Sequence, residues 1–365
     1  MPTDRNISLS IVKAAAIILM VAGHTEGPWW LTNFIYLFHM PVFFIAAGYF
    51  WKRVSVDAPW EFCAKRFRKL YVPMVVWSVV FLLLHNFWFD IGLLNETYGN
   101  LQGGVTHPYS LKTGLQRLVN IITAMAGYDE FLAGAFWFFR ALLVSSILFM
   151  IFHWLIDKRK KMSAWIPPTI IVGIVLAFTA LKIGYGLKVV NIVQGGIREC
   201  WGIMFFAIGV IYRHFEDKIP RWWWTNVVYA GVLIVGAWQH WAGMNLTPRM
   251  IDLATLPVTG ICGFLLLHNA ARALASYNSP ALRFLAYVGD NTLPIFVLHI
   301  ICFKAAAAIQ IAAVGLDWQM IGCHMVVHHP TTAAGYWLLY TVAGVVLPLL
   351  LDRALRRIKL ARFSK

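Results

Sequence analysis

The chain has 365 residues, of which 60% are hydrophobic and only 13% are charged. Soluble domains average roughly 45–50% apolar and 25% charged residues, so this composition excludes an ordinary soluble enzyme. The aromatic content of 15% and the mean hydropathy of +0.67 exclude a disordered chain. A formal net charge of +15 would suit a nucleic-acid binder, but Lys and Arg punctuate apolar runs along the whole chain. The composition therefore predicts a polytopic membrane protein without a nucleic-acid partner.

About ten stretches are apolar enough to cross the hydrocarbon core of a bilayer as helices. We predict an all-α bundle, because lipid offers no partner to the backbone groups of an open strand edge. The first run contains Lys13 and His24 and lacks a small-residue cleavage site, which indicates a retained helix rather than a signal peptide. In chain order the predicted spans cover approximately residues 7–24, 33–51, 70–89, 135–156, 164–182, 197–212, 222–242, 250–270, 284–304 and 335–351.

The distribution of Lys and Arg predicts the orientation of the chain in the membrane. Placing the N-terminus in the cytoplasm puts most of the 31 basic residues on the cytoplasmic side, which the positive-inside rule favours. Both termini are then cytoplasmic, with one transmembrane domain over residues 1–352 and a basic tail over 353–365. The external segment 90–134 is expected to carry an interfacial or re-entrant helix from residue 111 to 126, and 305–334 to form a second external loop.

Lys13 and His24 are ionisable residues in or beside the first span, where charge is costly and therefore indicates a functional site. Eleven residues of helix separate them by roughly 16 Å along the axis and about 20° around it, so they share one face. His24, near the outer surface, is suited to act as a general base near neutral pH. Alternatively, His24 bonds a structural neighbour and Lys13 extends toward the inner interface. Glu26 is a candidate to orient the His24 ring, or is an acid exposed at the outer mouth of the bundle.

Further ionisable residues fall in the outer third of later spans under this orientation. Arg140 lies in the fourth span, Arg198 and Glu199 begin the sixth, and His299 and Lys304 lie near the end of the ninth. Together they could bind an anionic or sugar-like acceptor, or the arginines could pair with Glu199. For Lys304, reaching the interface is the simpler expectation.

A basic cluster precedes the third span. Arg66, Arg68 and Lys69 are suited to binding the phosphates of a cytosolic ligand, although such clusters also serve only to set orientation. A glycine-rich phosphate loop, a Ser/His/Asp order and a His-Glu-x-x-His element are all absent from the sequence. The five cysteines show no paired or metal-like spacing, so we predict neither a disulfide framework nor a metal site.

Five segments, taken together, resemble motifs of acyltransferase family 3, particularly its fucose 4-O-acetylase-like branch. They occur in the family's order and extend over nearly the whole chain. The segments are Lys13-x10-His24, the run from Phe38-His39-Met40-Pro41 to Gly48-Tyr49, Arg66-x-x-Lys69-Leu70-x-x-Pro73, Phe136-Trp137-Phe138, and Gly289-Asp290-Asn291-Thr292-Leu293 to His299.

The resemblance implies a ten-helix membrane O-acyltransferase in a bacterial inner membrane. Such an enzyme takes an acetyl or similar acyl group from cytosolic acyl-coenzyme A and passes it to a hydroxyl of a glycan or other acceptor at the outer face. By the resemblance, His24 is catalytic, Lys13 supports it, and Arg66 and Lys69 lie on the coenzyme A side. Transfer is direct or passes through an acylated His24.

Two other functions also fit the sequence. A transporter or flippase for an anionic or lipid-linked sugar would use the same intramembrane cations as a binding site. The two halves of the chain show no hydropathy repeat, which speaks against this alternative. The third possibility is a non-catalytic membrane sensor that retains the fold.

Overall fold

A computed structural model describes residues 7–158, 162–187, 196–244, 246–277 and 279–363. These described residues form helices, turns and loops and contain no strand, which confirms the predicted all-α class. The chain divides into two compact units. The first comprises residues 1–16, 33–73 and 138–286, and the second comprises 17–32, 74–137 and 287–365.

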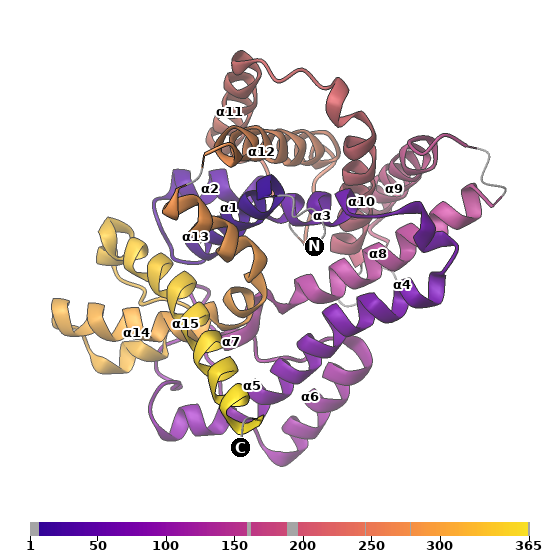
Figure 1. Cartoon of the computed structure of the whole chain (residues 1–365). Coiled ribbons are helices and arrows are strands. Elements are labelled where there is room, and N and C mark those ends of the chain that lie inside the picture. The colour runs from indigo at the N-terminus through magenta and orange to yellow at the C-terminus, as the bar shows by residue number, and fades with distance from the viewer. Residues whose placement is uncertain (1–6, 159–161, 188–195, 245, 278, 364–365) are drawn as a thin grey trace. The chain divides into compact units, whose positions relative to one another are not determined.

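In the first unit, helices pack around α10 (Ile197–Phe215). This helix contacts α3 (His39–Tyr49) and α9 (Ile166–Tyr185), while α12 (Asp252–Ala275) contacts α3 and α11 (Trp223–Trp238) (Figure 1). The remaining helices that lie wholly or partly in this unit are α1 (Ile7–Gly23), α2 (Trp29–Tyr36), α4 (Pro59–Arg66), α8 (Trp137–Ile156) and α13 (Pro280–Asp290).

Glycines on α3 and α10 let the backbones of these two helices come into direct contact. A Cβ atom on Gly48 would lie 2.0 Å from the carbonyl oxygen of Phe206, and one on Gly209 would lie 2.1 Å from that of Ile45. Both distances are far below van der Waals contact, so neither position accepts a side chain without moving a helix. In a membrane, where lipid competes equally for apolar side chains, such close packing provides much of the helix association.

Gly48→Ala should therefore destabilise the protein by about 1–3 kcal/mol, because the added methyl group forces the two backbones apart. The expected result is a lower melting temperature of the detergent-solubilised protein. Gly173→Ala, in α9, is the matched control, since no atom lies within 4 Å of its Cβ position. A Gly48→Ala variant with the same melting temperature as the Gly173→Ala control would contradict this close packing.

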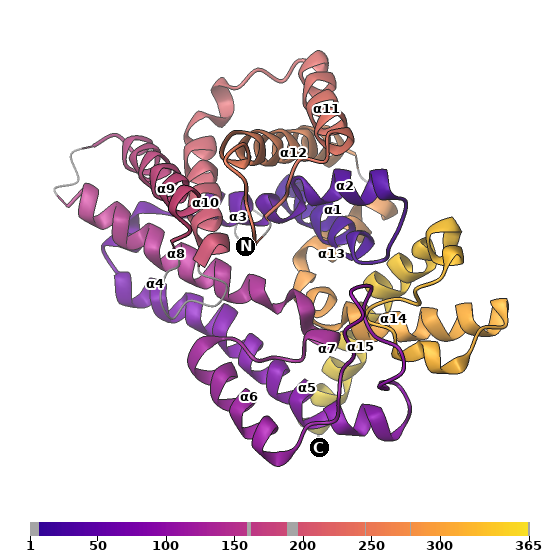
Figure 2. The same ribbon diagram turned by 180° about the vertical axis from the view of Figure 1, so that it is seen from behind.

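The second unit is built on the pairing of α14 (Thr292–Val314) with α15 (Trp337–Phe363) (Figure 2). The short helix α7 (Glu130–Ala133) also packs on α14. Gly344 permits the close contact of α15 with α14, because a Cβ atom on Gly344 would lie 2.5 Å from the ring of Phe303 in α14. The unit also contains α6 (Leu111–Ala124) and all but the first two residues of α5 (Val72–Asp90).

Within the described residues, seven helical stretches are long and apolar enough to span a membrane. They are Trp29–Tyr49, Pro59–Asp90, Glu130–Ile156, Ile166–Tyr185, Asp252–Ala275, Thr292–Val314 and Thr332–Arg357. Two shorter apolar helices, Ile7–Gly23 and Trp223–Trp238, and the 19-residue α10 match the other predicted spans. The number of ten crossings and their orientation remain predictions.

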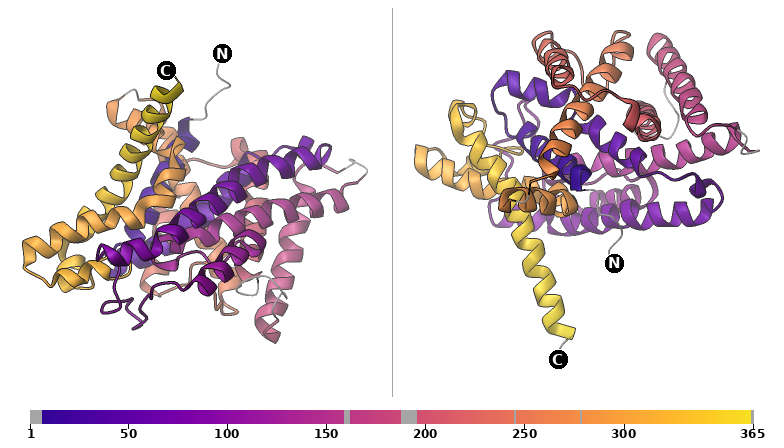
Figure 3. Two further views of the ribbon diagram at one scale, coloured as in Figure 1. Left: turned by 90° about the horizontal axis from the view of Figure 1, so that it is seen from below. Right: turned by 45° about the horizontal axis from the view of Figure 1, so that its top comes forward.

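Three boundaries differ from those expected. The predicted ninth span, 284–304, is divided between α13 and α14. Asn291 lies between the two helices, and Pro294 falls in the first turn of α14, where a proline is tolerated. Helix α14 then continues through residues expected in an external loop and ends at Val314, next to Gly315 at φ +74°. The basic tail extends α15 as an uninterrupted helix to Phe363, visible in yellow in Figure 3. The expected helix in segment 90–134 is α6.

Candidate active site

Two histidines far apart in the sequence meet in the second unit. His24 follows the last turn of α1, and His299 lies in α14. The Nδ1 atom of His24 is 3.0 Å from the Nε2 atom of His299, and the rings stack with their centres 5.2 Å apart. His299 is 1% exposed, whereas His24 is half-buried. His24 is therefore the member of the pair that a substrate can reach.

The hydrogen bonds of His299 determine which nitrogen of His24 carries its proton. The Nδ1 atom of His299 lies 3.0 Å from the carbonyl oxygen of Phe296 and 3.2 Å from that of Ile295, so Nδ1 is a donor. In the neutral ring Nε2 is then the acceptor, and Nδ1–H of His24 donates to it. This leaves the lone pair of His24 on Nε2. A base held in one tautomer by a second group is the arrangement used to activate hydroxyl nucleophiles.

The loop that carries His24 has its own anchors. Thr25 Oγ1 donates to the Ala22 carbonyl at 2.7 Å, and Glu26 adopts a left-handed conformation at φ 51°. Glu26 Oε1 lies 2.9 Å from Nδ1 of His328, whose Nε2 donates to the Gly99 carbonyl at 3.0 Å. His299 therefore occupies the orienting position expected of Glu26, whose carboxylate lies beside the His328 ring.

Lys304 is buried and bonded to backbone carbonyls. It is 5% exposed, and its Nζ donates to the carbonyl oxygens of Ile321 at 2.6 Å and Cys323 at 2.7 Å. Backbone carbonyls of the loop that follows α14 therefore satisfy the Lys304 amine, and its side chain is buried rather than exposed. In the loop beyond, burial lowers the pKa of His324 below its ordinary value and raises that of the Cys323 thiol.

Arg140 and Glu199 form a buried ion pair in the first unit. Arg140 Nε donates to Glu199 Oε1 at 2.9 Å, and the two residues are 5% and 3% exposed. The pairing that the sequence left open is thus present. Glu199 Oε2 is buried without a hydrogen-bond partner among the described residues, which leaves one acceptor for a hydroxyl donor. Arg198, the neighbour of Glu199, is half-buried.

A basic pocket of about 420 Å³ lies in the first unit, along one face of α4 and the turn that follows it. Residues 62, 65, 66 and 69 follow the i, i+3, i+4, i+7 spacing of a helical face, which puts three cations and a phenyl ring on one wall. The complete lining is Phe50, Trp51, Lys52, Ser55, Ala58, Glu61, Phe62, Lys65, Arg66 and Lys69.

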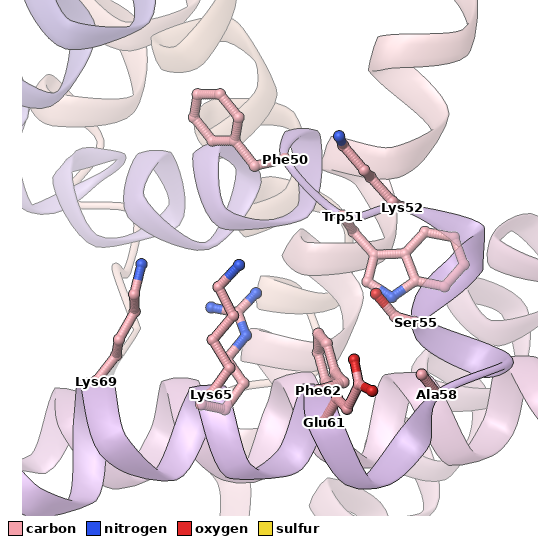
Figure 4. A pocket seen from close by; sticks show the side chains of 10 residues that line it. Phe50, Trp51, Lys52, Ser55, Ala58, Glu61, Phe62, Lys65 and Lys69 are labelled. Atoms are coloured by element: carbon pink, nitrogen blue, oxygen red, sulfur yellow. The ribbon is translucent and has the colours of Figure 1, made fainter. Parts of the chain in front are cut away.

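Figure 4 shows the amines of Lys65 and Lys69 pointing from this helix toward the segment that carries Phe50 and Lys52. The Arg66 guanidinium lies 5.2 Å from the centre of the Phe62 ring and 5.5 Å from that of Phe206, so two aromatic faces hold it in place. The indole nitrogen of Trp51 is a buried donor without a hydrogen-bond partner among the described residues. The pocket thus combines cations, aromatic rings and an unused donor.

Residues 6–353, nearly the whole chain, match the acyltransferase domain family Acyl_transf_3. The chain belongs to this family. With its apolar helices, it is an integral membrane acyltransferase. No curated protein and no solved structure shows a significant match to the chain.

Several predicted site residues of the acyltransferase can now be placed. Lys13 is half-buried in α1, the helix that precedes His24. Arg66 and Lys69 line the basic pocket, but Arg68 is exposed and is not among its lining residues.

Other residues of these sites were not singled out from the sequence. Lys65 directly precedes the basic cluster of Arg66, Arg68 and Lys69, and helical spacing groups it with Arg66 and Lys69. Trp51 and Phe62 carried no usable signal, because aromatic residues are frequent in every span of this chain. The contact between Glu26 and His328 joins positions about three hundred residues apart and likewise has no local signature.

Proposed function

We propose that this membrane acyltransferase transfers an acetyl or similar acyl group from cytosolic acyl-coenzyme A to a hydroxyl of a glycan or similar acceptor at the outer face of a bacterial inner membrane. The observation that carries the proposal is the His24–His299 pair, which holds His24 with its lone pair on Nε2. Both termini are cytoplasmic in this proposal, as the distribution of basic residues favours.

In the proposed reaction, Nε2 of His24 takes the proton of the acceptor hydroxyl as its oxygen attacks the thioester carbonyl. A C–O bond forms and the C–S bond breaks. The proton passes from His24 to the departing thiolate, which leaves as coenzyme A. His299 remains the acceptor of the Nδ1–H bond throughout, so the charge that develops on His24 does not change its orientation.

The basic pocket is suited to the nucleotide end of acyl-coenzyme A. Its lysines and Arg66 match the phosphates in charge, and the guanidinium is able to bind two phosphate oxygens at once. The aromatic rings of Phe50, Trp51 and Phe62 offer stacking faces for the adenine. A volume of about 420 Å³ lies in the range of small-molecule sites.

For the acceptor we propose a contribution of Arg140, Arg198 and Glu199. Arg140 occupies Oε1 of Glu199, and Oε2 of Glu199 is available to accept a hydrogen bond from a sugar hydroxyl. The neutralised pair favours a hydroxylated acceptor over a strongly anionic one, because the Arg140 charge is already balanced.

The decisive experiment incubates the purified protein with radiolabelled acetyl-coenzyme A and compares glycan acetylation in cells with and without the protein. Binding, slow hydrolysis and loss of acetylated glycan on deletion are expected. A folded protein that neither binds nor hydrolyses acetyl-coenzyme A would overturn the proposal and favour transport or sensing.

Replacing Lys65 and Lys69 together by Gln should weaken coenzyme A binding about 10- to 30-fold at low salt, since two phosphate contacts of roughly 1 kcal/mol each are lost. Isothermal titration calorimetry measures this change. Arg68→Gln is the matched control, because Arg68 neighbours Lys69 but is not among the residues that line the pocket. Equal weakening in the control would show that coenzyme A does not use this pocket.

A further inference from the structure

A second cavity in the first unit, of about 440 Å³, shares Trp51 and Lys52 with the first. Its lining residues come from the segment after α3, the last turns of α8 and α10, and the residues just before α9. The cavity is lined by Trp51, Lys52, Arg53, His153, Ala164, Val210, Arg213 and His214. Its lining contains no carboxylate and three residues that are cationic at neutral pH.

The cations of this cavity are only partly neutralised. Arg53 pairs with Asp157, which is 4% exposed. Arg213 donates to the carbonyl oxygens of Tyr49 at 3.2 Å and Trp51 at 3.3 Å, and these neutral partners hold the guanidinium without cancelling its charge. Lys52 is exposed at the rim. The cavity therefore keeps a positive potential that attracts an anion.

His153 is a buried polar group in the wall of this cavity. It is 1% exposed, and neither Nδ1 nor Nε2 has a hydrogen-bond partner among the described residues. Its ring lies against Trp51, with the centres 4.6 Å apart, and against Phe149 at 5.9 Å. Buried polar atoms are nearly always hydrogen-bonded, so two ring nitrogens without a partner among the described residues, on a side chain that lines a cavity, point to a ligand.

Other buried histidines of the same unit behave differently. Nδ1 of His39 donates to the Ile35 carbonyl at 2.9 Å, and Nδ1 of His268 lies 2.7 Å from the Tyr212 hydroxyl. Each of these rings therefore has a partner within the protein.

We propose that this second cavity binds a phosphate group, with an N–H of His153 donating to one phosphate oxygen and the Arg213 guanidinium and Lys52 amine binding others. Guanidinium and ammonium groups are the usual partners of phosphate, and buried N–H donors add directional bonds. The phosphate belongs either to a soluble phosphorylated compound or to the headgroup of a phospholipid. The proposal does not rest on the acyl-transfer reaction, although Trp51 and Lys52 line both cavities.

The test measures the melting temperature of the detergent-solubilised protein in inorganic phosphate and in chloride of equal ionic strength. A ligand that binds only the folded state raises the melting temperature, and we expect a rise of about 2 °C or more at saturating phosphate. His153→Phe should abolish most of this rise. In chloride it should melt no lower than the wild type, because an apolar ring replaces unpartnered nitrogens.

Two further variants keep the result decisive. Arg213→Gln, at an exposed position, should weaken phosphate binding about fivefold without loss of folding, since it removes one charge-assisted contact. The Lys65→Gln/Lys69→Gln variant, altered only in the first pocket, should keep at least half of the rise. A full rise in His153→Phe and Arg213→Gln, or its complete loss in the lysine variant, would overturn the proposal.

The source of the phosphate is distinguished by reconstitution. Nanodiscs of phosphatidylcholine with phosphatidic acid are compared with nanodiscs of phosphatidylcholine alone, without added phosphate. A His153-dependent rise with phosphatidic acid identifies a lipid headgroup. A rise with inorganic phosphate only identifies a soluble ligand, and no His153-dependent rise in either condition would overturn the site.

Discussion

Replacing His24 with alanine should lower the rate of acyl transfer by about 10²- to 10⁴-fold, the usual contribution of a general base. The reason is that Nε2 of His24 is the atom proposed to take the hydroxyl proton, and alanine has no group to replace it. The variant should still insert into the membrane and melt near the wild-type temperature, because His24 is half-buried at the end of α1 and its ring leaves little core space. Turnover of labelled acetyl-coenzyme A in the presence of acceptor measures the rate.

His107→Ala is a suitable control for the loss of an imidazole in the same unit. His107 is an exposed loop residue that pairs with Glu96 at 2.8 Å, and we expect its variant to turn over at the wild-type rate. Unchanged turnover in His24→Ala would remove His24 from the mechanism. Equal loss in both variants would indicate general damage to the unit rather than loss of the base.

Replacing His299 with leucine should slow acyl transfer by about 10- to 100-fold, the size of effect seen when the partner that orients a functional histidine is removed. Leucine cannot accept the Nδ1–H bond of His24, so the tautomer and the ring orientation are no longer determined. In the proposed mechanism His299 is a positioning residue, since it is buried and reaches the acceptor only through His24. Rates and melting temperatures are measured together.

The conservative variant His299→Gln separates positioning from a structural role. Its side-chain oxygen is able to accept the His24 bond, so most of the activity should return although the aromatic ring is absent. If His299 served only to fill space, leucine would be tolerated better than glutamine. Leucine activity equal to or above that of glutamine would therefore contradict the positioning role.

The sequence alone determined the class of this protein and its candidate chemistry. Long apolar runs can satisfy their backbone groups in lipid only as helices, so composition and run length were enough to predict an all-α membrane protein. His24 and Lys13 were conspicuous because ionisable residues near a membrane span are costly. The spacing of Lys65, Arg66 and Lys69 along the sequence also indicates that they share one face of a helix, because helical spacing is a local property. These three residues form one wall of the basic pocket.

The tertiary structure decided which of these groups act together. His24 and His299 are separated by 275 positions, and Arg140 and Glu199 by 59, and only the packing of helices brings each pair within hydrogen-bond distance. It also left His153, which lines a cavity, without a hydrogen-bond partner among the described residues, whereas His39 and His268 have one. Hydropathy is averaged over a span and contains no information on which face meets which neighbour, so partners, tautomers and cavities follow from the folded chain.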